Sequence, residues 1–116
     1  MKVLIVEDEI FAALHLEATI EELGCKVVGI APDAESAMEL AAEQPDLAFV
    51  DLNLRDGLTG PEIARDLANR YGTKVLILTA NPGQAGEPFD GLLGVVSKPW
   101  NDREIVQTVR AATGRE

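Results

Sequence analysis

Short apolar runs that end in polar or turn-forming residues recur along the chain and predict five strands. They are rich in β-branched residues, and they occupy Lys2–Val6, Lys26–Ala31, Leu47–Val50, Lys74–Leu78 and Leu92–Ser97. An unbroken apolar run such as Leu-Ala-Phe-Val at 47–50 is typical of a strand that is buried on both faces. Strands of this kind are found in parallel sheets that carry helices on both sides, so the pattern favours an α/β fold.

Apolar positions at helical spacing between the strands predict helices. In 10–23, four apolar residues share one helical face, and Gly24 follows where glycine commonly ends a helix. Three more helices are expected behind a capping residue: from Asp33 to about Glu43, from Thr59 to about Tyr71, and from Asn101 past Val109. Glutamate stands three residues after both Thr59 and Asn101, which is the capping-box pattern.

The stretch 80–91 is the least regular part of the chain. Asn-Pro-Gly at 81–83 and Gly-Glu-Pro at 86–88 leave room for one or two helical turns. Glycine and proline both interrupt helices, so any helix here is expected to be short and mobile.

Strands and helices otherwise alternate along the chain, and the connections between them are short. Short connections give right-handed crossovers between parallel strands, with helices on both faces of the sheet. We therefore predict a doubly wound, five-stranded parallel sheet in a single domain, which a length of 116 residues also indicates.

The composition narrows the partners that such a domain can have. Hydrophobic residues make up 47% and charged residues 26% of the chain, as in ordinary globular proteins. The formal net charge of −10 makes nucleic acid and anionic membrane surfaces poor partners. A single cysteine excludes an internal disulfide, and no apolar stretch approaches the length of a membrane span or signal peptide. We expect a cytoplasmic protein.

Chemistry is expected where the strands end. Glu7 and Asp8 follow the first strand, Asp51 the third, Thr79 the fourth and Lys98 the fifth. Carboxyl ends of parallel strands share one edge of the sheet, and three acids at that edge repel one another unless a cation is present. An all-oxygen set suits Mg²⁺. With the metal in place, the aspartate is expected to attack a phosphoryl group whose oxygens the metal, the lysine and the threonine neutralise.

Four motifs in this order resemble the receiver domain of bacterial two-component response regulators. They are Val-Glu-Asp-Glu at 6–9, Val-Asp-Leu-Asn-Leu at 50–54, Leu-Thr-Ala at 78–80 and Ser-Lys-Pro at 97–99. The resemblance covers the whole chain, residues 1–116, and implies a stand-alone receiver with a flavodoxin-like (βα)5 fold. It also implies that Asp51 accepts a phosphoryl group from a histidine kinase or phosphotransfer protein in two-component signal transduction.

The same resemblance implies roles for the residues around the phosphoacceptor. Asp8 and Asp51 would coordinate Mg²⁺, Glu7 would act through water, and the Asn53 backbone carbonyl would complete the ligands. Thr79 and Lys98 would bind phosphoryl oxygens, the Lys98–Pro99 bond would be cis, and Asn53 and Asn81 would tune spontaneous dephosphorylation.

The output of such a domain is a changed binding face for a downstream protein target. We expect this face, and a homodimer contact, on the fourth helix, fifth strand and fifth helix, because the mobile stretch 80–91 lies there. Receivers usually carry Tyr or Phe three residues before the lysine, as a switch whose rotamer reports phosphorylation, whereas this chain has Val95. We therefore expect signalling to use the threonine and the irregular loop.

Three other functions fit the sequence less well. A pseudo-receiver that binds partners constitutively is favoured by Val95 but disfavoured by the complete set of acids, threonine and lysine. An aspartyl phosphatase of the dehalogenase type needs a second acid two residues after the nucleophile, where this chain has Asn53. A dinucleotide-binding fold needs a glycine-rich loop after the first strand, which is missing. We therefore expect a phosphoacceptor that catalyses its own phosphorylation and dephosphorylation, not an enzyme that turns over external substrates.

Overall fold

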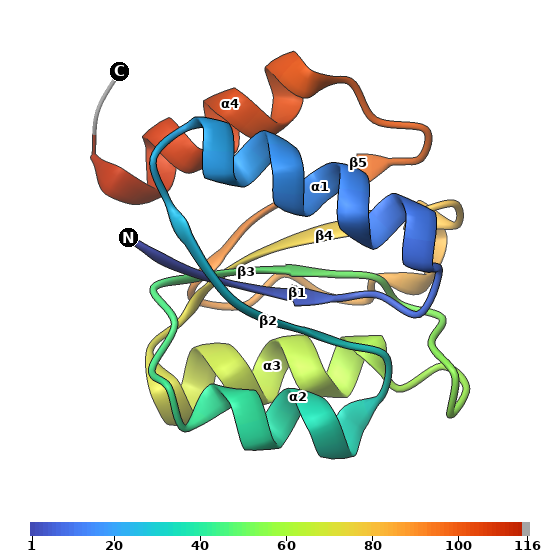
Figure 1. The fold of residues 1–116 in the computed structure, drawn as a ribbon. Helices are drawn as coiled ribbons and strands as arrows, with labels where there is room; N and C mark the ends of the chain where they lie inside the picture. The colour runs from blue at the N-terminus through green and yellow to red at the C-terminus, as the bar shows by residue number, and fades with distance from the viewer. Residues whose placement is uncertain (115–116) are drawn as a thin grey trace.

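The computed structural model describes residues 1–114, which form a five-stranded parallel sheet between two layers of helices (Figure 1). The strands are β1 (Lys2–Val6), β2 (Lys26–Ala31), β3 (Leu47–Val50), β4 (Lys74–Thr79) and β5 (Leu92–Ser97). They lie in the order β2-β1-β3-β4-β5, and every neighbouring pair is parallel. The predicted doubly wound sheet is confirmed, and β3 is its central strand.

Two helices cover each face of the sheet. Figure 1 shows α1 (Ile10–Glu22) and α4 (Asp102–Thr113) on one side, and α2 (Ala34–Ala41) and α3 (Gly60–Tyr71) on the other. No helix among residues 1–114 combines the length and the apolar character that a membrane crossing requires. The helices instead use their apolar faces to cover the sheet.

The sheet separates two apolar cores, because successive side chains of a strand point to opposite faces. In β3, Leu47 and Phe49 pack toward α1 and α4, whereas Ala48 and Val50 pack toward α2 and α3. All four side chains are buried. Burial of a residue such as Phe49 contributes about 2–3 kcal/mol, so the central strand is strongly fixed between the two cores. Its carboxyl end, where Asp51 follows, is fixed with it.

Capping side chains begin three of the four α-helices of residues 1–114. Glu9 accepts hydrogen bonds from the amides of Phe11 and Ala12, and Asp33 accepts one from Ser36. Asn101 and Glu104 form the predicted capping box at the start of α4. These side chains satisfy amides that have no partner within the helix.

The capping box predicted at Thr59 is wrong. Thr59 has helical dihedral angles, its side chain caps nothing, and its hydroxyl donates instead to Asp56 Oδ1 at 2.7 Å. The reason lies in the next residue. Gly60 is pressed against the backbone of 51–52, and its amide donates to the Leu52 carbonyl at 3.0 Å. This contact fixes the start of α3 in place of a capping side chain.

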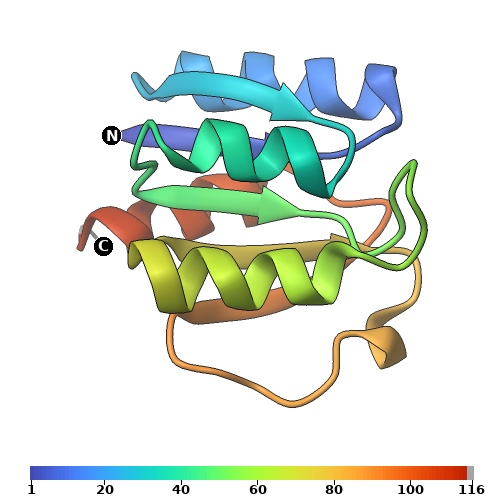
Figure 2. The ribbon, with the colours of Figure 1, turned by 90° about the horizontal axis from the view of Figure 1, so that it is seen from below.

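The fourth α-helix implied by the (βα)5 resemblance is absent from residues 1–114. Between β4 and β5 the chain makes a single 3-10 turn, η1 (Pro82–Gln84), and otherwise runs as an irregular segment, visible below the sheet in Figure 2. Prolines at 82 and 88 and glycines at 83 and 86 prevent a longer helix, as the sequence predicted. Ala85 and Phe89 from this segment pack onto the α2–α3 core in place of a helix.

Candidate functional site

The carboxyl ends of the strands bring the predicted site residues to one edge of the sheet. Glu7 follows β1, Asp51 follows β3, Thr79 ends β4 and Lys98 follows β5. Because β3 lies between β1 and β4, Asp51 is central at this edge, which is the right-hand edge in Figure 1. Backbone bonds fix the ends of the strands: the Asp51 amide donates to the Val6 carbonyl at 2.9 Å.

Lys98 connects two of the carboxylates. Its Nζ donates to Asp51 Oδ2 at 2.9 Å and also to Glu7 Oε1. The side chains of Glu7, Asp51 and Lys98 are 7%, 11% and 22% exposed, so all three groups are largely removed from water. Partly desolvated charges need partners, and each of the three finds one here.

The remaining carboxylate oxygens are held by backbone amides. Glu7 Oε2 accepts from the amides of Asp8 at 3.1 Å and Glu9 at 3.2 Å. Asp51 Oδ1 accepts from the Leu52 amide at 2.7 Å. These bonds fix the orientation of both carboxylates before any ligand arrives.

Burial and ion pairing act in opposite directions on the charged groups. Burial raises the pKa of Glu7 above its ordinary value of 4.5, although the hydrogen bond from Lys98 partly offsets this effect. Burial also acts to lower the pKa of Lys98, but the hydrogen bonds to Glu7 and Asp51 outweigh it, so the pKa is raised above 10.5. Lys98 is therefore a retained positive charge beside Asp51 at neutral pH.

The acidic cluster fits a divalent cation. One carboxylate oxygen from each of Glu7, Asp8 and Asp51 lies within 4.8 Å of the others. The three carboxylates exceed the single Lys98 ammonium by two negative charges, which a divalent ion balances. The all-oxygen donor set is the kind that Mg²⁺ prefers. Asp8 is the most exposed of the three acids, whereas Glu7 is already held by the lysine and two amides.

Thr79 and Asn81 lie on the other side of Asp51. Thr79 is fully buried, and its hydroxyl accepts a hydrogen bond from the Asn81 amide at 3.0 Å. The Thr79 carbonyl accepts from the Lys98 amide at 2.9 Å, which ties the ends of β4 and β5 together. The Lys98–Pro99 peptide bond that follows is cis.

Asn53 contacts a residue that the sequence did not indicate. Its side-chain Nδ2 donates to Gln84 Oε1 at 2.9 Å, across 31 positions of the chain. No pattern in the sequence marks Gln84, which is a polar residue in an irregular stretch. Only the folding of η1 against the loop after β3 places the two amides together.

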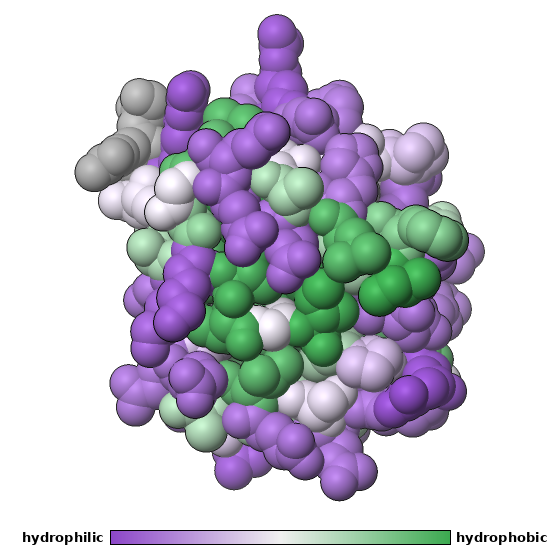
Figure 3. Space-filling view, viewed as in Figure 1, coloured by the Kyte–Doolittle hydropathy of each residue, from purple (hydrophilic) through white to green (hydrophobic). Residues whose placement is uncertain are grey.

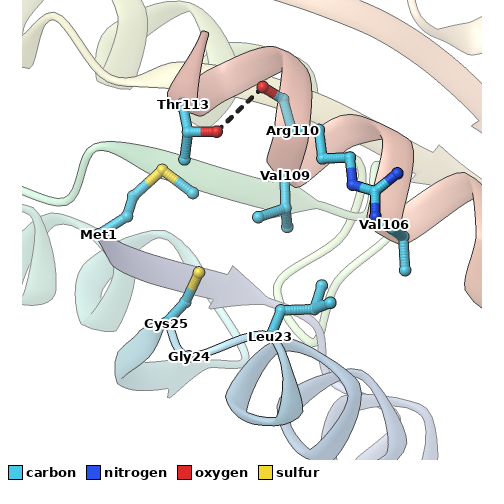
Figure 4. A pocket seen from close by; sticks show the side chains of 8 residues that line it. All are labelled: Met1, Leu23, Gly24, Cys25, Val106, Val109, Arg110 and Thr113. Atoms are coloured by element: carbon cyan, nitrogen blue, oxygen red, sulfur yellow. Dashed lines mark hydrogen bonds between the residues drawn. The ribbon is translucent and has the colours of Figure 1, made fainter. Parts of the chain in front are cut away.

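A cavity lies at the end of the molecule opposite the acidic site. It is lined by Met1, Leu23, Gly24, Cys25, Val106, Val109, Arg110 and Thr113. Figure 4 shows Met1, Cys25 and Val109 around one space between α4 and the start of β2. This space adjoins the amino ends of the strands, so it is remote from Asp51 and takes no part in the acidic site.

The surface next to the acidic site is apolar. Ile10, Phe11 and Leu14, in the first half of α1, are large apolar residues that are exposed, and Phe11 is 77% exposed. Figure 3 shows apolar side chains gathered on the face that α1 and α2 flank. The helix α1 therefore carries apolar residues on its outer side as well as toward the core, which is typical of a surface that contacts a partner.

The structure thus combines a doubly wound parallel sheet with three acids, a buried threonine and a lysine at its carboxyl edge. The family model of the response regulator receiver domain matches residues 3–110. The chain therefore belongs to the response regulator receiver domain family. This confirms the resemblance seen in the sequence.

Three of the proteins that this chain is similar to are PhyR proteins. Phyllosphere-induced regulator PhyR of Methylorubrum extorquens is 31% identical over 118 residues, covering 96% of this chain and 43% of that protein. The receiver domain of PhyR from Erythrobacter litoralis, solved by NMR, has a TM-score of 0.88 at 29% identity, covering 97% of this chain and 89% of that one. Anti-anti-sigma factor PhyR from Bartonella quintana has a TM-score of 0.82 at 29% identity, covering 96% and 47%. The chain thus spans less than half the length of the curated relative.

Proposed function

We propose that Asp51 accepts a phosphoryl group from a histidine kinase or phosphotransfer protein and that this event changes a protein-binding face. The observation that carries the proposal is the position of Lys98, whose ammonium connects Asp51 to Glu7 within an edge of three carboxylates. A structural ion pair needs one acid for one lysine. Here two further acids converge on the same place, which suits a cation and a transferred phosphoryl group.

Asp51 acts as the nucleophile. An oxygen of its carboxylate forms a bond to phosphorus, the bond from phosphorus to the donor's imidazole nitrogen breaks, and that nitrogen takes a proton from solvent. The amide of Leu52 and the ammonium of Lys98 hold the carboxylate for this attack. The product is an acyl phosphate, which adds roughly −1.5 to −2 charges to the edge of the sheet.

Two residues of the chain then meet the new charge. Lys98 is within reach of it, since its Nζ already contacts Asp51 Oδ2. The Thr79 hydroxyl, at the end of the neighbouring strand, is a donor that turns to a phosphoryl oxygen. Lys98 is bonded to Glu7, and the Thr79 hydroxyl accepts from the Asn81 amide. Movement of the two side chains changes these bonds, so the segment after β4 is expected to respond.

Mg²⁺ would be held by the carboxylates of Asp8 and Asp51 and by the backbone carbonyl of Asn53, with Glu7 acting through water. The bound ion supplies positive charge that neutralises the phosphoryl oxygens. Glu7 suits the indirect role, because both of its oxygens are already engaged by Lys98 and by backbone amides.

Incorporation of label from acetyl phosphate in Mg²⁺ tests this proposal. Wild type is expected to take up one phosphoryl group, and Asp51→Ala is expected to take up none. Asp90→Ala, which removes an exposed acid far along the irregular segment, is the matched control and should behave as wild type. Label on Asp51→Ala at the wild-type level would contradict the proposal.

The partners follow from the surface around the site. A donor protein that brings its histidine to Asp51 meets the exposed apolar residues at the start of α1, which follows directly after Asp8 and Glu9.

For output, we propose the face formed by η1, β5 and α4, where the chain carries a 3-10 turn in place of the expected fourth helix. The likeness to an anti-anti-sigma factor makes an anti-sigma factor a candidate target, and a homodimer through this face is tested by sedimentation with and without phosphorylation.

Val95 favours a second function, that of a pseudo-receiver with a constitutive binding face. It lies on the edge strand β5 and is 38% exposed. Because this position holds valine, no aromatic side chain can rotate there to report the state of Asp51. Titration with fluoroberyllate, a phosphoryl mimic, separates the two functions by NMR. Shifts at Thr79 and through 80–91 support the switch, whereas a spectrum unchanged in these residues supports the constitutive module.

A further inference from the structure

One side-chain hydrogen bond joins the loop after Asp51 to the segment that replaces the fourth helix. Asn53 Nδ2 donates to Gln84 Oε1 at 2.9 Å. Among the hydrogen bonds of residues 1–114, no other links 51–59 to 80–91. The bond crosses from the carboxyl end of β3 to the carboxyl end of β4, which are neighbouring strands. It therefore bridges the two segments that follow Asp51 and Thr79.

The residue at the far end of this bond is well anchored. The Gln84 amide donates to the Asn81 carbonyl at 2.9 Å, and the next amide, of Ala85, donates to the Pro82 carbonyl at 3.1 Å. Ala85 itself is buried in the α2–α3 core. Gln84 thus projects from a turn that the buried Ala85 anchors on its carboxyl side.

The segment beyond the turn is held by α3. Arg65 donates from its guanidinium to the Glu87 carbonyl at 2.8 Å and lies 5.0 Å from the ring centre of Phe89. A guanidinium over an aromatic ring is an attractive contact. The segment that carries Gln84 is therefore tied to α3, so a bond to Gln84 restricts the Asn53 side chain.

We propose that Gln84 is a positioning residue of the phosphoacceptor site. By holding the Asn53 side chain over the β3–β4 side of the edge, it fixes the Asn53 backbone carbonyl for Mg²⁺ and limits the access of water to phosphorylated Asp51. This inference rests on the proposed function. It adds a residue that the four sequence motifs do not include.

The step that Gln84 would slow is hydrolysis of the acyl phosphate. The oxygen of water forms a bond to phosphorus, the bond from phosphorus to the Asp51 oxygen breaks, and both protons of the water leave with the product as H₂PO₄⁻. The Asp51 carboxylate is regenerated. Asn53 lies two residues from this carboxylate, and freeing its amide opens the approach for water.

The test compares Gln84→Ala, Gln84→Glu and Gly83→Ala in the full chain. Gln84→Ala is expected to hydrolyse the acyl phosphate about two- to tenfold faster and to bind Mg²⁺ more weakly by a similar factor, the range that one neutral hydrogen bond contributes. Gln84→Glu keeps an acceptor for Asn53 and is expected to restore the lifetime. Gly83→Ala alters the same turn where a Cβ meets open space, and should match wild type.

Two further measurements separate positioning from a general effect on folding. In metal-free protein, the Asn53 side-chain amide resonances should shift in Gln84→Ala but not in Gly83→Ala. In an Asn53→Ala background, Gln84→Ala should have no further effect on the lifetime, as expected for two residues that act through one contact.

The outcomes distinguish this inference from the proposed function. If Asp51 takes up phosphoryl groups but Gln84→Ala leaves both lifetime and Mg²⁺ affinity unchanged, the role of Gln84 is overturned and the proposed function stands. The same holds if Gly83→Ala reproduces the effect, or if the effect persists without the Asn53 side chain. If Asp51 takes up no phosphoryl group in wild type, both are overturned.

Discussion

Asp8 and Asp51 illustrate how neighbouring acids at one edge differ in their surroundings. Asp51 is nearly buried and bonded to Lys98 and the Leu52 amide. Asp8 is exposed, and among the ion pairs of residues 1–114 it has no cationic partner. Asp8 therefore adds repulsion to the metal-free edge.

Removal of the Asp8 charge should have two effects, one on the stability of the metal-free protein and one on the binding of Mg²⁺. Asp8→Asn is expected to raise the free energy of unfolding in chelator by on the order of 1 kcal/mol, because a like charge within 4.8 Å of the other two carboxylates is removed. It should also lose the stabilisation that wild type gains from excess Mg²⁺. Thermal unfolding with and without Mg²⁺ measures both. Unchanged stabilisation by Mg²⁺ in Asp8→Asn would contradict the assignment of Asp8 as a ligand.

Asp33 gives a pH-dependent prediction away from the site. Hydrogen bonds from the Ser36 side chain and amide, together with Arg55, lower the pKa of Asp33 from 3.8 to about 2. A carboxylate whose pKa is lower in the folded state stabilises the fold above its unfolded pKa, and this contribution is lost as the pH falls toward the folded pKa. The contribution should therefore be complete above pH 4 and disappear between about pH 4 and 2.

The variant Asp33→Asn tests this pH dependence. Asparagine still caps a helix, so the variant removes mainly the charge that faces Arg55. It is expected to be less stable than wild type at neutral pH, and the difference should shrink as the pH falls from 4 to 2. Denaturant unfolding at several pH values measures it, with Asp90→Asn as the control. A difference in unfolding free energy between the variant and wild type that is constant with pH would contradict the prediction.

At the scale of elements, the start of α3 couples packing to the site. Gly60 begins this helix with no room for a side chain, since a Cβ would overlap the Asp51 carbonyl oxygen and the Leu52 backbone. Within a helix, alanine is ordinarily better than glycine by roughly 1 kcal/mol. Here the overlap dominates.

Gly60→Ala is expected to lower the free energy of unfolding by about 2–3 kcal/mol, the cost of overpacking against backbone that cannot move aside. It should also slow phosphorylation, because the displaced backbone carries Asp51. Urea unfolding and uptake of label from acetyl phosphate measure the two effects. Gly83→Ala, where a Cβ meets open space, is the control. A stability equal to wild type would show that α3 can shift to make room.

At the scale of the whole molecule, the net charge of −10 is the dominant property. Like charges repel across the folded surface, and salt screens this repulsion with a Debye length of about 8–10 Å at physiological ionic strength. Added monovalent salt should therefore raise the free energy of unfolding by about 0.5–1 kcal/mol, or roughly 2–5 °C in Tm.

Calorimetry in sodium chloride and in choline chloride measures this rise, and the two salts should act alike. A rise with sodium alone would indicate a specific ion site in place of general screening. No rise with either salt would show that the acids are already neutralised by their local partners.

The sequence predicted the elements well where local patterns are strong. The bounds of β1, β2, β3 and β5 and the Asn101 capping box agree with the structure, because apolar runs and capping side chains act over a few residues. The capping box predicted at Thr59 is wrong, because close packing of Gly60 against another segment, and not a local cap, fixes the start of α3.

For the site, the sequence placed the acids, Thr79 and Lys98 at one edge because parallel strands end together, and this gathering is what the structure shows. Their roles stay predictions. The sequence alone determined the alternation of strands and helices and the chemical character of the strand ends, since both follow from residue type and spacing. Only the tertiary structure decided which groups touch: that Lys98 connects Glu7 to Asp51, and that Gln84 reaches Asn53. These contacts join residues far apart in the chain, and no local pattern records them.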